Sequence, residues 1–196
     1  ALHAEEEIRA ALQKFQDGYT QRDVTRLDDF MTLFGKNSAL EVIGTGGIEP
    51  EDEEWCRNRS TIASLIENDW NFWGDVKLDV PGARIGVRGS TAWLSTSGTV
   101  SRLIGTEQGH QNYLDAIQLT IQKRKDLNAE QKLLEILRGI SNTIYEGHKG
   151  TAYIWPMRFS AVLIRETDGQ WRFQQVHFSF PTTHFPDVRL NEAETE

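Results

Sequence analysis

Two segments near the end of the chain read Ala152-Tyr-Ile-Trp-Pro-Met-Arg-Phe-Ser-Ala-Val-Leu-Ile164 and Gln170-Trp-Arg-Phe-Gln-Gln-Val-His-Phe-Ser-Phe180. Together they predict a long β-hairpin with a short turn between its strands. Because strand side chains alternate with period two, one face of the second strand is predicted to carry Trp171, Phe173, Gln175, His177 and Ser179. An aromatic face that continues into a histidine and a serine indicates a sheet with an apolar floor at one end and a polar pocket at the other.

Length and composition narrow the class of protein. A chain of 196 residues with 38% hydrophobic residues is sufficient for one packed domain, and no apolar run approaches the ~20 residues that span a bilayer. The net charge of −8 disfavours a nucleic-acid partner. Cys56 is the single cysteine, which excludes an internal disulfide and weakly favours a reducing compartment. We therefore expect a cytoplasmic protein with no membrane partner; no signal peptide is visible, and whether a segment precedes Ala1 stays open.

Helical spacing dominates the first third of the chain. One apolar stripe predicts a first helix ending near Gln21, Asp23 can cap a second helix, and Ser60 is the expected N-cap of a third. Strands are predicted at 38–43, 75–80, 83–87 and 91–104. The stripe of the first helix consists of Ile8, Leu12, Phe15 and Tyr19.

Residues 111–144 return to helical spacing and predict a helical hairpin. Asn128 and Gln131 have the spacing of a capping box at the start of its second arm. The hairpin interrupts a run of strands, so we interpret about 107–146 as an insertion or lid within a single domain, 1–196. The segment 181–196 is predicted to be a tail outside the sheet.

This order of elements resembles the NTF2-like superfamily, and within it the SnoaL-like domains. The resemblance covers residues 4–105 and 150–182. It is carried by Phe15 with Arg22-Asp-Val24 and Leu27, by the strand Asn37-Ser-Ala-Leu-Glu-Val42, by Trp93, and by Gly169-Gln-Trp-Arg-Phe173 with Val176-His-Phe-Ser179. It implies an α+β, cone-shaped, cystatin-like fold, in which a bent antiparallel sheet packs on the N-terminal helices. It also implies a homodimer through the open face of the sheet and a pocket between sheet and helices.

The resemblance does not imply one activity, because the superfamily includes isomerases, polyketide cyclases, epoxide hydrolases, dehydratases and non-catalytic association domains. The tyrosine and aspartate of the isomerase chemistry fall on Phe15 and Val42 here, so that reading fails at both positions. Glu41 is adjacent to the second position but faces the opposite side of a strand.

The candidate site residues form two groups. His177 is the candidate acid–base residue, since an imidazole exchanges protons near neutral pH, and Trp93, Ser95, Arg158 and Ser179 are candidate ligand-binding residues around it. A buried, hydrogen-bonded role for His177 is the alternative. The second group consists of Asp69, which either ends the third helix or reaches the pocket, its neighbour Trp70, and Tyr19.

The sequence therefore predicts a domain that binds a small, largely apolar organic molecule. It leaves open whether the domain also catalyses proton transfer or hydration without a cofactor, in the SnoaL-like manner, or is a non-catalytic binding or association module. No metal or cofactor is expected, because neither a metal-ligand spacing nor a phosphate-binding glycine loop is present.

Overall fold

The computed structural model describes residues 2–47, 49–51, 54–103, 106–134, 136–137, 140 and 152–180. The chain divides into two compact units, one formed by Ala1–Ser101 with Trp155–Pro181 and the other by Arg102–Ile154 with Thr182–Glu196. The first unit contains α1–α3 and most of the sheet. The predicted tail, 181–196, lies outside the described residues.

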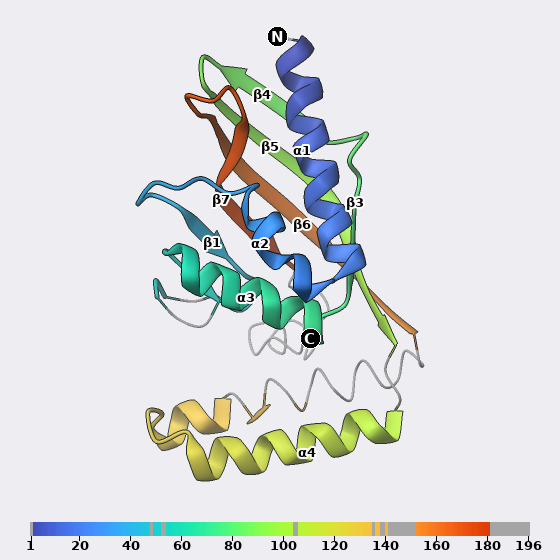
Figure 1. Ribbon diagram of the computed structural model, residues 1–196. Helices are drawn as coiled ribbons and strands as arrows, with labels where there is room; N and C mark the ends of the chain where they lie inside the picture. Colours follow the sequence, from blue (N-terminus) through green and yellow to red (C-terminus); the bar gives the residue numbers. More distant parts are fainter. Residues whose placement is uncertain are drawn as a thin grey trace, which may run out of the picture. The chain divides into compact units, whose positions relative to one another are not determined.

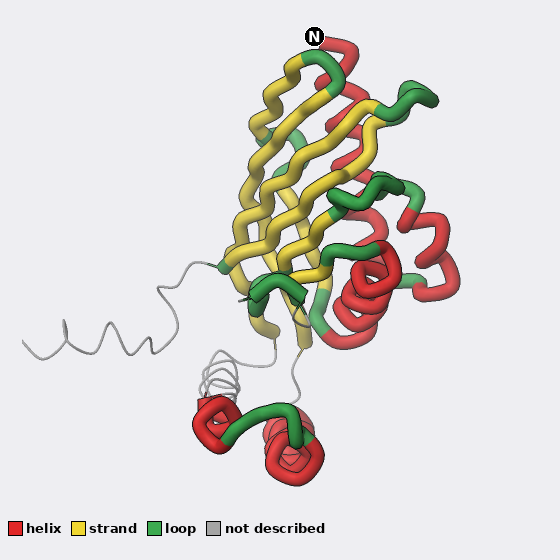
Figure 2. The backbone as a smooth tube through the Cα atoms, turned by 90° about the vertical axis from the view of Figure 1, so that its left-hand side faces the viewer, coloured by secondary structure: helices red, strands yellow, loops and turns green. Residues whose placement is uncertain are grey.

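The described strands form one sheet in the order β2-β1-β7-β6-β5-β3, with β4 paired to β5 (Figures 1 and 2). The predicted hairpin is confirmed as β6 and β7, which pair antiparallel. The sheet is mixed rather than wholly antiparallel, because β1 lies parallel to β7. The strands are β1 (Glu41–Ile43), β2 (Trp55–Cys56), β3 (Asp75–Leu78), β4 (Arg84–Arg88), β5 (Thr91–Leu103), β6 (Ala152–Arg165) and β7 (Trp171–Ser179).

The helices of the first unit lie on one face of this sheet (Figure 2). They are α1 (Leu2–Gln21), the 3₁₀ turn η1 (Val24–Arg26), α2 (Leu27–Met31) and α3 (Arg59–Phe72). Asp23 caps η1, the turn that leads into α2, by accepting a hydrogen bond from Thr25 N–H. The second helix itself, α2, has Arg26 as its N-cap, so the predicted capping of that helix by Asp23 is wrong. The N-cap of α3 is Asn58 and not Ser60, because the Asn58 side chain accepts the hydrogen bond from Thr61 N–H at 3.0 Å.

An aromatic cluster joins α1 to the sheet. The ring of Phe15 is stacked on Tyr19 at 5.1 Å between centroids and lies 5.1 Å from Phe159 on β6. It also contacts Phe173 and Phe178 on β7, at 5.2 and 6.0 Å. The predicted apolar stripe of α1 is therefore the face that packs on the sheet, and it fixes where Tyr19 lies.

Polar side chains of α1 also cover the edge strand β3. The side-chain oxygen of Gln16 accepts a hydrogen bond from Leu78 N–H at 2.6 Å, and the Thr20 hydroxyl donates to the Val76 carbonyl at 3.2 Å. Since unpaired backbone groups on an edge strand invite pairing with other chains, these bonds protect that edge.

A β-bulge at Gln174 overturns the predicted face of β7. Val162 pairs with Gln175 but Leu163 pairs with Phe173, so Gln174 is the extra residue and the alternation reverses there. Trp171 and Phe173 face the helices, whereas beyond the bulge Val176 and Phe178 take that side. Gln175, His177 and Ser179 therefore face away from the helices, and the predicted continuation of the aromatic face into His177 and Ser179 is wrong.

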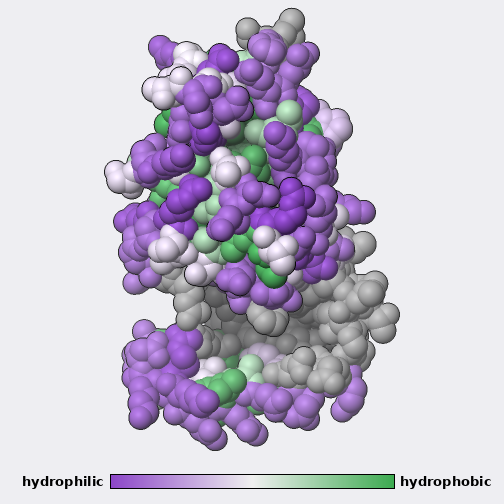
Figure 3. All heavy atoms as spheres, viewed as in Figure 1, coloured by the Kyte–Doolittle hydropathy of each residue, from purple (hydrophilic) through white to green (hydrophobic). Residues whose placement is uncertain are grey.

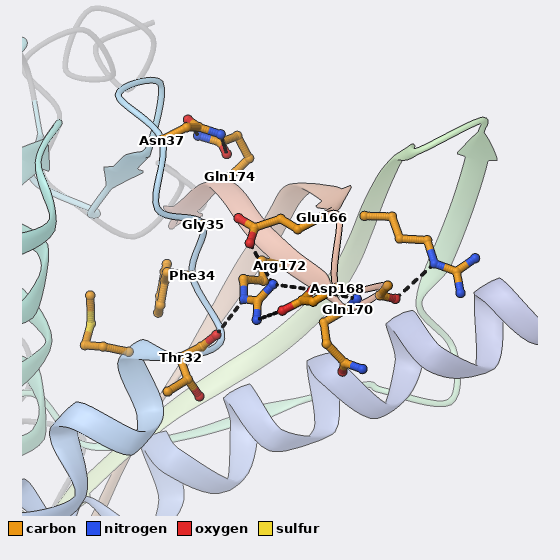
Figure 4. Close-up of polar contacts among 12 residues, drawn as sticks. Thr32, Phe34, Gly35, Asn37, Glu166, Asp168, Gln170, Arg172 and Gln174 are labelled. Carbon is orange, nitrogen blue, oxygen red and sulfur yellow. Dashed lines mark hydrogen bonds and ion pairs between the residues drawn. The ribbon is translucent and has the colours of Figure 1, made fainter.

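The bulge is held by the segment that follows α2 (Figure 4). Phe173 N–H donates to the Leu33 carbonyl at 2.8 Å, and Gly35 N–H donates back to the Phe173 carbonyl at 2.9 Å. The buried amide of Gln174 exchanges two hydrogen bonds with Asn37, at 2.6 and 2.7 Å. The partners that satisfy this bulge lie far from it in sequence, so local alternation does not reveal it.

The second unit contains the predicted helical hairpin. Its first arm is α4 (Thr106–Lys123), and a second helical segment begins at Ala129. Asn128 and Gln131 exchange two hydrogen bonds at 2.9 Å, which confirms the capping box. The Tyr113 hydroxyl donates to the Ile136 carbonyl at 2.6 Å and so ties the two arms together. The predicted residues 141–144 lie outside the described part.

Several leucines and isoleucines of this second unit are exposed, and Figure 3 shows hydrophobic residues at its surface. None of the described helices has the length and apolar character needed to cross a membrane.

The packing around Gly18 gives a test of the core. A Cβ atom at this position of α1 would lie 2.3 Å from two ring atoms of the buried Phe30. Gly18→Ala should gain about 1 kcal/mol of helix propensity but lose more through overpacking, a net destabilisation of about 1–2 kcal/mol in urea denaturation. Phe30→Leu should reduce the penalty of Gly18→Ala in a double-mutant cycle. A Gly18→Ala variant as stable as the wild type would show that the two positions do not pack together.

Candidate functional site

A cavity of about 170 Å³ opens in the first unit between the end of β1, the side of α3 and the end of β7. Its apolar walls come from Leu65 and Trp73 at α3 and from Phe178 on β7. The remaining lining residues are Gly44, Thr45, Glu54, Asn68 and Asp69. The cavity thus combines an apolar wall with carboxylates, an amide and a hydroxyl.

Asp69 and Tyr19 form a hydrogen-bonded pair at this cavity. The Tyr19 hydroxyl donates to Asp69 Oδ2 at 2.9 Å. Tyr19 is buried, with 1% of its surface exposed, while Asp69 is half-buried in the cavity wall. The side chains come from different helices, α1 and α3, and their contact positions one oxygen of Asp69.

The spacing of α3 explains why Asp69 reaches the cavity. Leu65 and Asp69 are four residues apart, and such residues lie on the same face of a helix. Tyr19 is likewise four residues after Phe15, so the stripe that packs α1 on the sheet carries the Tyr19 hydroxyl to Asp69.

Burial controls the protonation of the pair. It raises the pKa of Asp69 from its ordinary 3.8 to about 7, with a further rise from the negative charge of Glu54, while the Tyr19 hydrogen bond acts in the opposite direction. Burial, the charge of Asp69 and the hydrogen bond to it all raise the pKa of Tyr19. At neutral pH Tyr19 is therefore a stable donor, whereas Asp69 exists in both protonation states.

The first predicted group lies on the other side of the sheet, which we call the outer face. Arg158 pairs with Ser179 and Ser160 with His177 across β6 and β7. The alternate residue Phe159 contacts Phe15 of α1, so this set points away from the helices. His177 and Arg158 are exposed and Ser179 is half-buried. The buried alternative for His177 is therefore wrong, and none of the three lines the cavity.

Trp93 and Ser95 also belong to the outer face. Both are exposed, while their neighbours Ala92 and Leu94 are buried. Trp93 pairs with Gly86 of β4, and its indole lies where a Cβ atom of Gly86 would be. These residues do not gather around a pocket as predicted. They share an exposed surface across β5, β6 and β7, because none of the described helices of the first unit covers the outer face (Figure 2).

The side chains of Trp70 and its neighbour Asp69 lie at different cavities. Its ring contacts Phe30 at 5.0 Å and Tyr19 at 6.3 Å, and it borders a different cavity of about 340 Å³ between α1 and α2. Its Nε1–H is buried and has no acceptor among the described residues. Tyr19 and Asp69 are the two predicted site residues that the structure joins by a hydrogen bond.

Thr45, Glu54, Trp73 and Phe178 were not predicted as site residues. The run Gly44-Thr-Gly-Gly47 indicates only a turn, and Phe178 changes sides because of the bulge. The one sequence signal for this cavity was a polar residue beside an apolar helical stripe, and Asp69 is such a residue. Within the described ranges no three histidine, cysteine or acidic side chains are grouped to hold a metal ion.

No protein-family model matches the sequence, and no curated protein matches it. Solved structures, by contrast, do match this chain. A candidate dehydratase of the NTF2-like family from Streptomyces avermitilis has a TM-score of 0.56 at 11% identity, over 92% of this chain and 98% of that one. An NTF2-like superfamily protein from Salmonella enterica has a TM-score of 0.55 at 18% identity, over 93% and 95% of the two chains.

This chain has the NTF2-like fold. A ketosteroid isomerase-like protein from Erwinia carotovora supports the same fold, with a TM-score of 0.52 at 8% identity over 90% of this chain and 95% of that chain. The predicted α+β NTF2-like, cystatin-like architecture is thereby confirmed. At such identities the likeness establishes the fold and no activity; the finer SnoaL-like assignment stays a prediction.

The raised pKa of Asp69 predicts a pH-dependent stability. The folded state holds this proton more tightly than the unfolded state, so the stability contributed by the protonated form is complete below about pH 4 and is lost as the pH rises through about 7. The difference corresponds to up to about 4 kcal/mol. Asp69→Asn cannot ionise and still accepts from Tyr19, so its unfolding free energy should exceed that of the wild type increasingly from pH 4 to 8.

Urea denaturation of both proteins across this pH range measures the effect. Asp29→Asn, at an exposed position of α2, is the matched control and should give a parallel pH profile to the wild type. Parallel profiles for Asp69→Asn and the wild type would contradict a raised pKa at Asp69.

Proposed function

We propose that this NTF2-like domain binds a small, largely apolar organic molecule in the cavity beside Asp69 and exchanges a proton with it. The observation that carries the proposal is a carboxyl group with a pKa of about 7 in the wall of a cavity, held by a buried tyrosine. Perturbed carboxyl groups in clefts are typical of acid–base sites.

The arrangement assigns a role to each group. Tyr19 O–H occupies Asp69 Oδ2, so Oδ1 is the oxygen that takes a proton from the ligand or returns one to it. A pKa near neutrality makes the acid and the base forms accessible in turn. Leu65, Trp73 and Phe178 supply the apolar contact, and Thr45 and Asn68 can hydrogen-bond polar atoms of the ligand. In an isomerisation, Asp69 would take a proton from one atom of the ligand and return it to another. In a dehydration, it would take a proton from carbon and give it to the hydroxyl group, which leaves as water when the C–O bond breaks, so neither reaction needs a cofactor.

Obstruction of the cavity mouth tests the binding part of this proposal. Asn68 and Glu67 are adjacent exposed residues of α3, but Asn68 lines the cavity and Glu67 does not. Native mass spectrometry of the purified protein, followed by denaturing analysis of released small molecules, should detect a ligand on the wild type. Asn68→Trp should lose at least about 90% of the bound ligand, while Glu67→Trp should retain it.

Two further variants separate chemistry from binding once that ligand is known. At saturating ligand, Asp69→Asn should lose turnover by about 10²–10⁴-fold, the usual contribution of a general acid or base, whatever its effect on affinity. His177→Ala should alter neither, because His177 lies on the outer face. Full turnover in Asp69→Asn would leave the domain a binding module in this cavity, and loss of turnover in His177→Ala would support the catalytic role that its sequence context predicted.

We also propose that the outer face forms a homodimer interface, as the resemblance implies. The described helices of the first unit leave this face uncovered (Figure 2), and it exposes Trp93 at 52% of its surface; this aromatic side chain is the observation that supports the interface.

Trp93→Glu should shift the protein toward monomer in analytical ultracentrifugation by at least about tenfold in dissociation constant, since a buried charge in an interface is costly. Val24→Glu is the control, because Val24 is 40% exposed on η1, away from the sheet. A monomeric wild type, or equal effects of both variants, would contradict this interface.

A further inference from the structure

The charges around the cavity differ from those expected for a carbonyl or carboxylate ligand. The described lining residues include two acidic side chains, Glu54 and Asp69, and no lysine, arginine or histidine. Glu54 Oε2 accepts the Gly46 N–H at 2.5 Å, which keeps this carboxylate at the loop that borders the cavity. The negative charge of Glu54 contributes to the raised pKa of Asp69. An anionic ligand would therefore be repelled on entry.

Aromatic rings also line the cavity. The rings of Trp73 and Phe178 are 5.5 Å apart between centroids and nearly perpendicular, at 86°. Trp73 is also perpendicular to Tyr19, at 81° and 6.4 Å. The face of an aromatic ring attracts cations, so an indole or phenyl ring in the lining can contribute to binding a cation that lies over its face.

Carboxylates and aromatic rings in the lining of one cavity are the two elements that recognise an organic ammonium group. We propose that the ligand of this cavity is a small protonated amine, whose ammonium group is bound by Asp69 and whose apolar body lies against Trp73 and Phe178. The inference rests on the proposed function, since it concerns the same cavity, and it names the chemical class of the ligand.

The size of the cavity limits that class. Its volume of about 170 Å³ is the share of roughly five or six water molecules in the liquid. A monocyclic aromatic amine or a short branched alkylamine fits such a space.

Binding of an ammonium group would couple to the proton on Asp69. In the described part of the chain, the groups that act on Asp69 are the Tyr19 hydroxyl from α1 and the Glu54 carboxylate from the loop before β2. Neither can neutralise a charged Asp69 carboxylate, so a cationic ligand would be the group that compensates it. The affinity should therefore rise between pH 5.5 and 8 as Asp69 ionises, by up to about tenfold per pH unit below the pKa of Asp69.

Three probes that share one ring and differ in charge test the inference: benzylammonium, benzyl alcohol and benzoate. Isothermal titration of the full chain, freed of any co-purified ligand, should give at least about tenfold tighter binding for benzylammonium than for benzyl alcohol, and no binding of benzoate. Asn68→Trp should abolish benzylammonium binding and Glu67→Trp should not. Asp69→Asn should reduce the preference for benzylammonium over benzyl alcohol to less than about threefold.

The outcomes separate this inference from the proposed function. Suppose that benzyl alcohol or benzoate binds as tightly as benzylammonium and that Asn68→Trp abolishes this binding. Such a result would overturn the ammonium inference while supporting a ligand cavity at Asp69. Benzylammonium binding that is unchanged in Asn68→Trp would place the cation elsewhere on this acidic protein and would also overturn it. Failure of all three probes to bind overturns the inference as well, and the native mass spectrometry described above then decides the proposed function by itself.

Discussion

The contact of Phe15 with the sheet is the interaction on which the rest of the first unit depends. Its ring lies within 6.1 Å of six other aromatic rings, which come from α1, α2 and the segment after it, β6 and β7. Burial of a phenylalanine side chain contributes about 1.5–3 kcal/mol, and edge and offset contacts between rings add to it. Because this one ring touches each layer, it fixes the distance between α1 and the sheet and hence the place of every residue that α1 carries.

The site follows from that placement. Tyr19 lies one helical turn after Phe15, and its ring is stacked on Phe15 while its hydroxyl bonds Asp69. The half-buried carboxyl of Asp69 is stabilised by this single hydrogen bond and destabilised in its charged form by burial and by Glu54. A carboxyl group balanced in this way exchanges its proton near neutral pH, which an exposed aspartate does not do. The function proposed for the cavity is a consequence of how an aromatic core surrounds one acid.

The bulge at Gln174 divides the sheet into two surfaces with different roles. Without the extra residue, Phe178 would point away from the helices and His177 toward them, and the cavity would lose an aromatic wall. With it, His177, Arg158 and Ser179 join Trp93 and Ser95 on the outer face. The bulge persists because Asn37 satisfies the buried amide of Gln174, and because Leu33 and Gly35 bond the backbone of Phe173. Arg172 reinforces the same corner through Glu166, Asp168 and the Thr32 carbonyl (Figure 4).

The sequence by itself determined the kinds and order of the elements, because hydrophobic period and capping residues are local properties. The stripe through Phe15 and Tyr19, the β6–β7 hairpin and the Asn128–Gln131 capping box could all be predicted from neighbouring residues, and so could the NTF2-like fold through its resemblance. Asp69 and Tyr19 could be named as candidates, but not as a pair, since their contact joins residues 50 positions apart. Only the tertiary structure decided which residues of β7 face the helices, because the bulge is held by hydrogen bonds from a segment 137 positions away. Burial, which sets the proton affinity of Asp69, likewise exists only after the chain has packed.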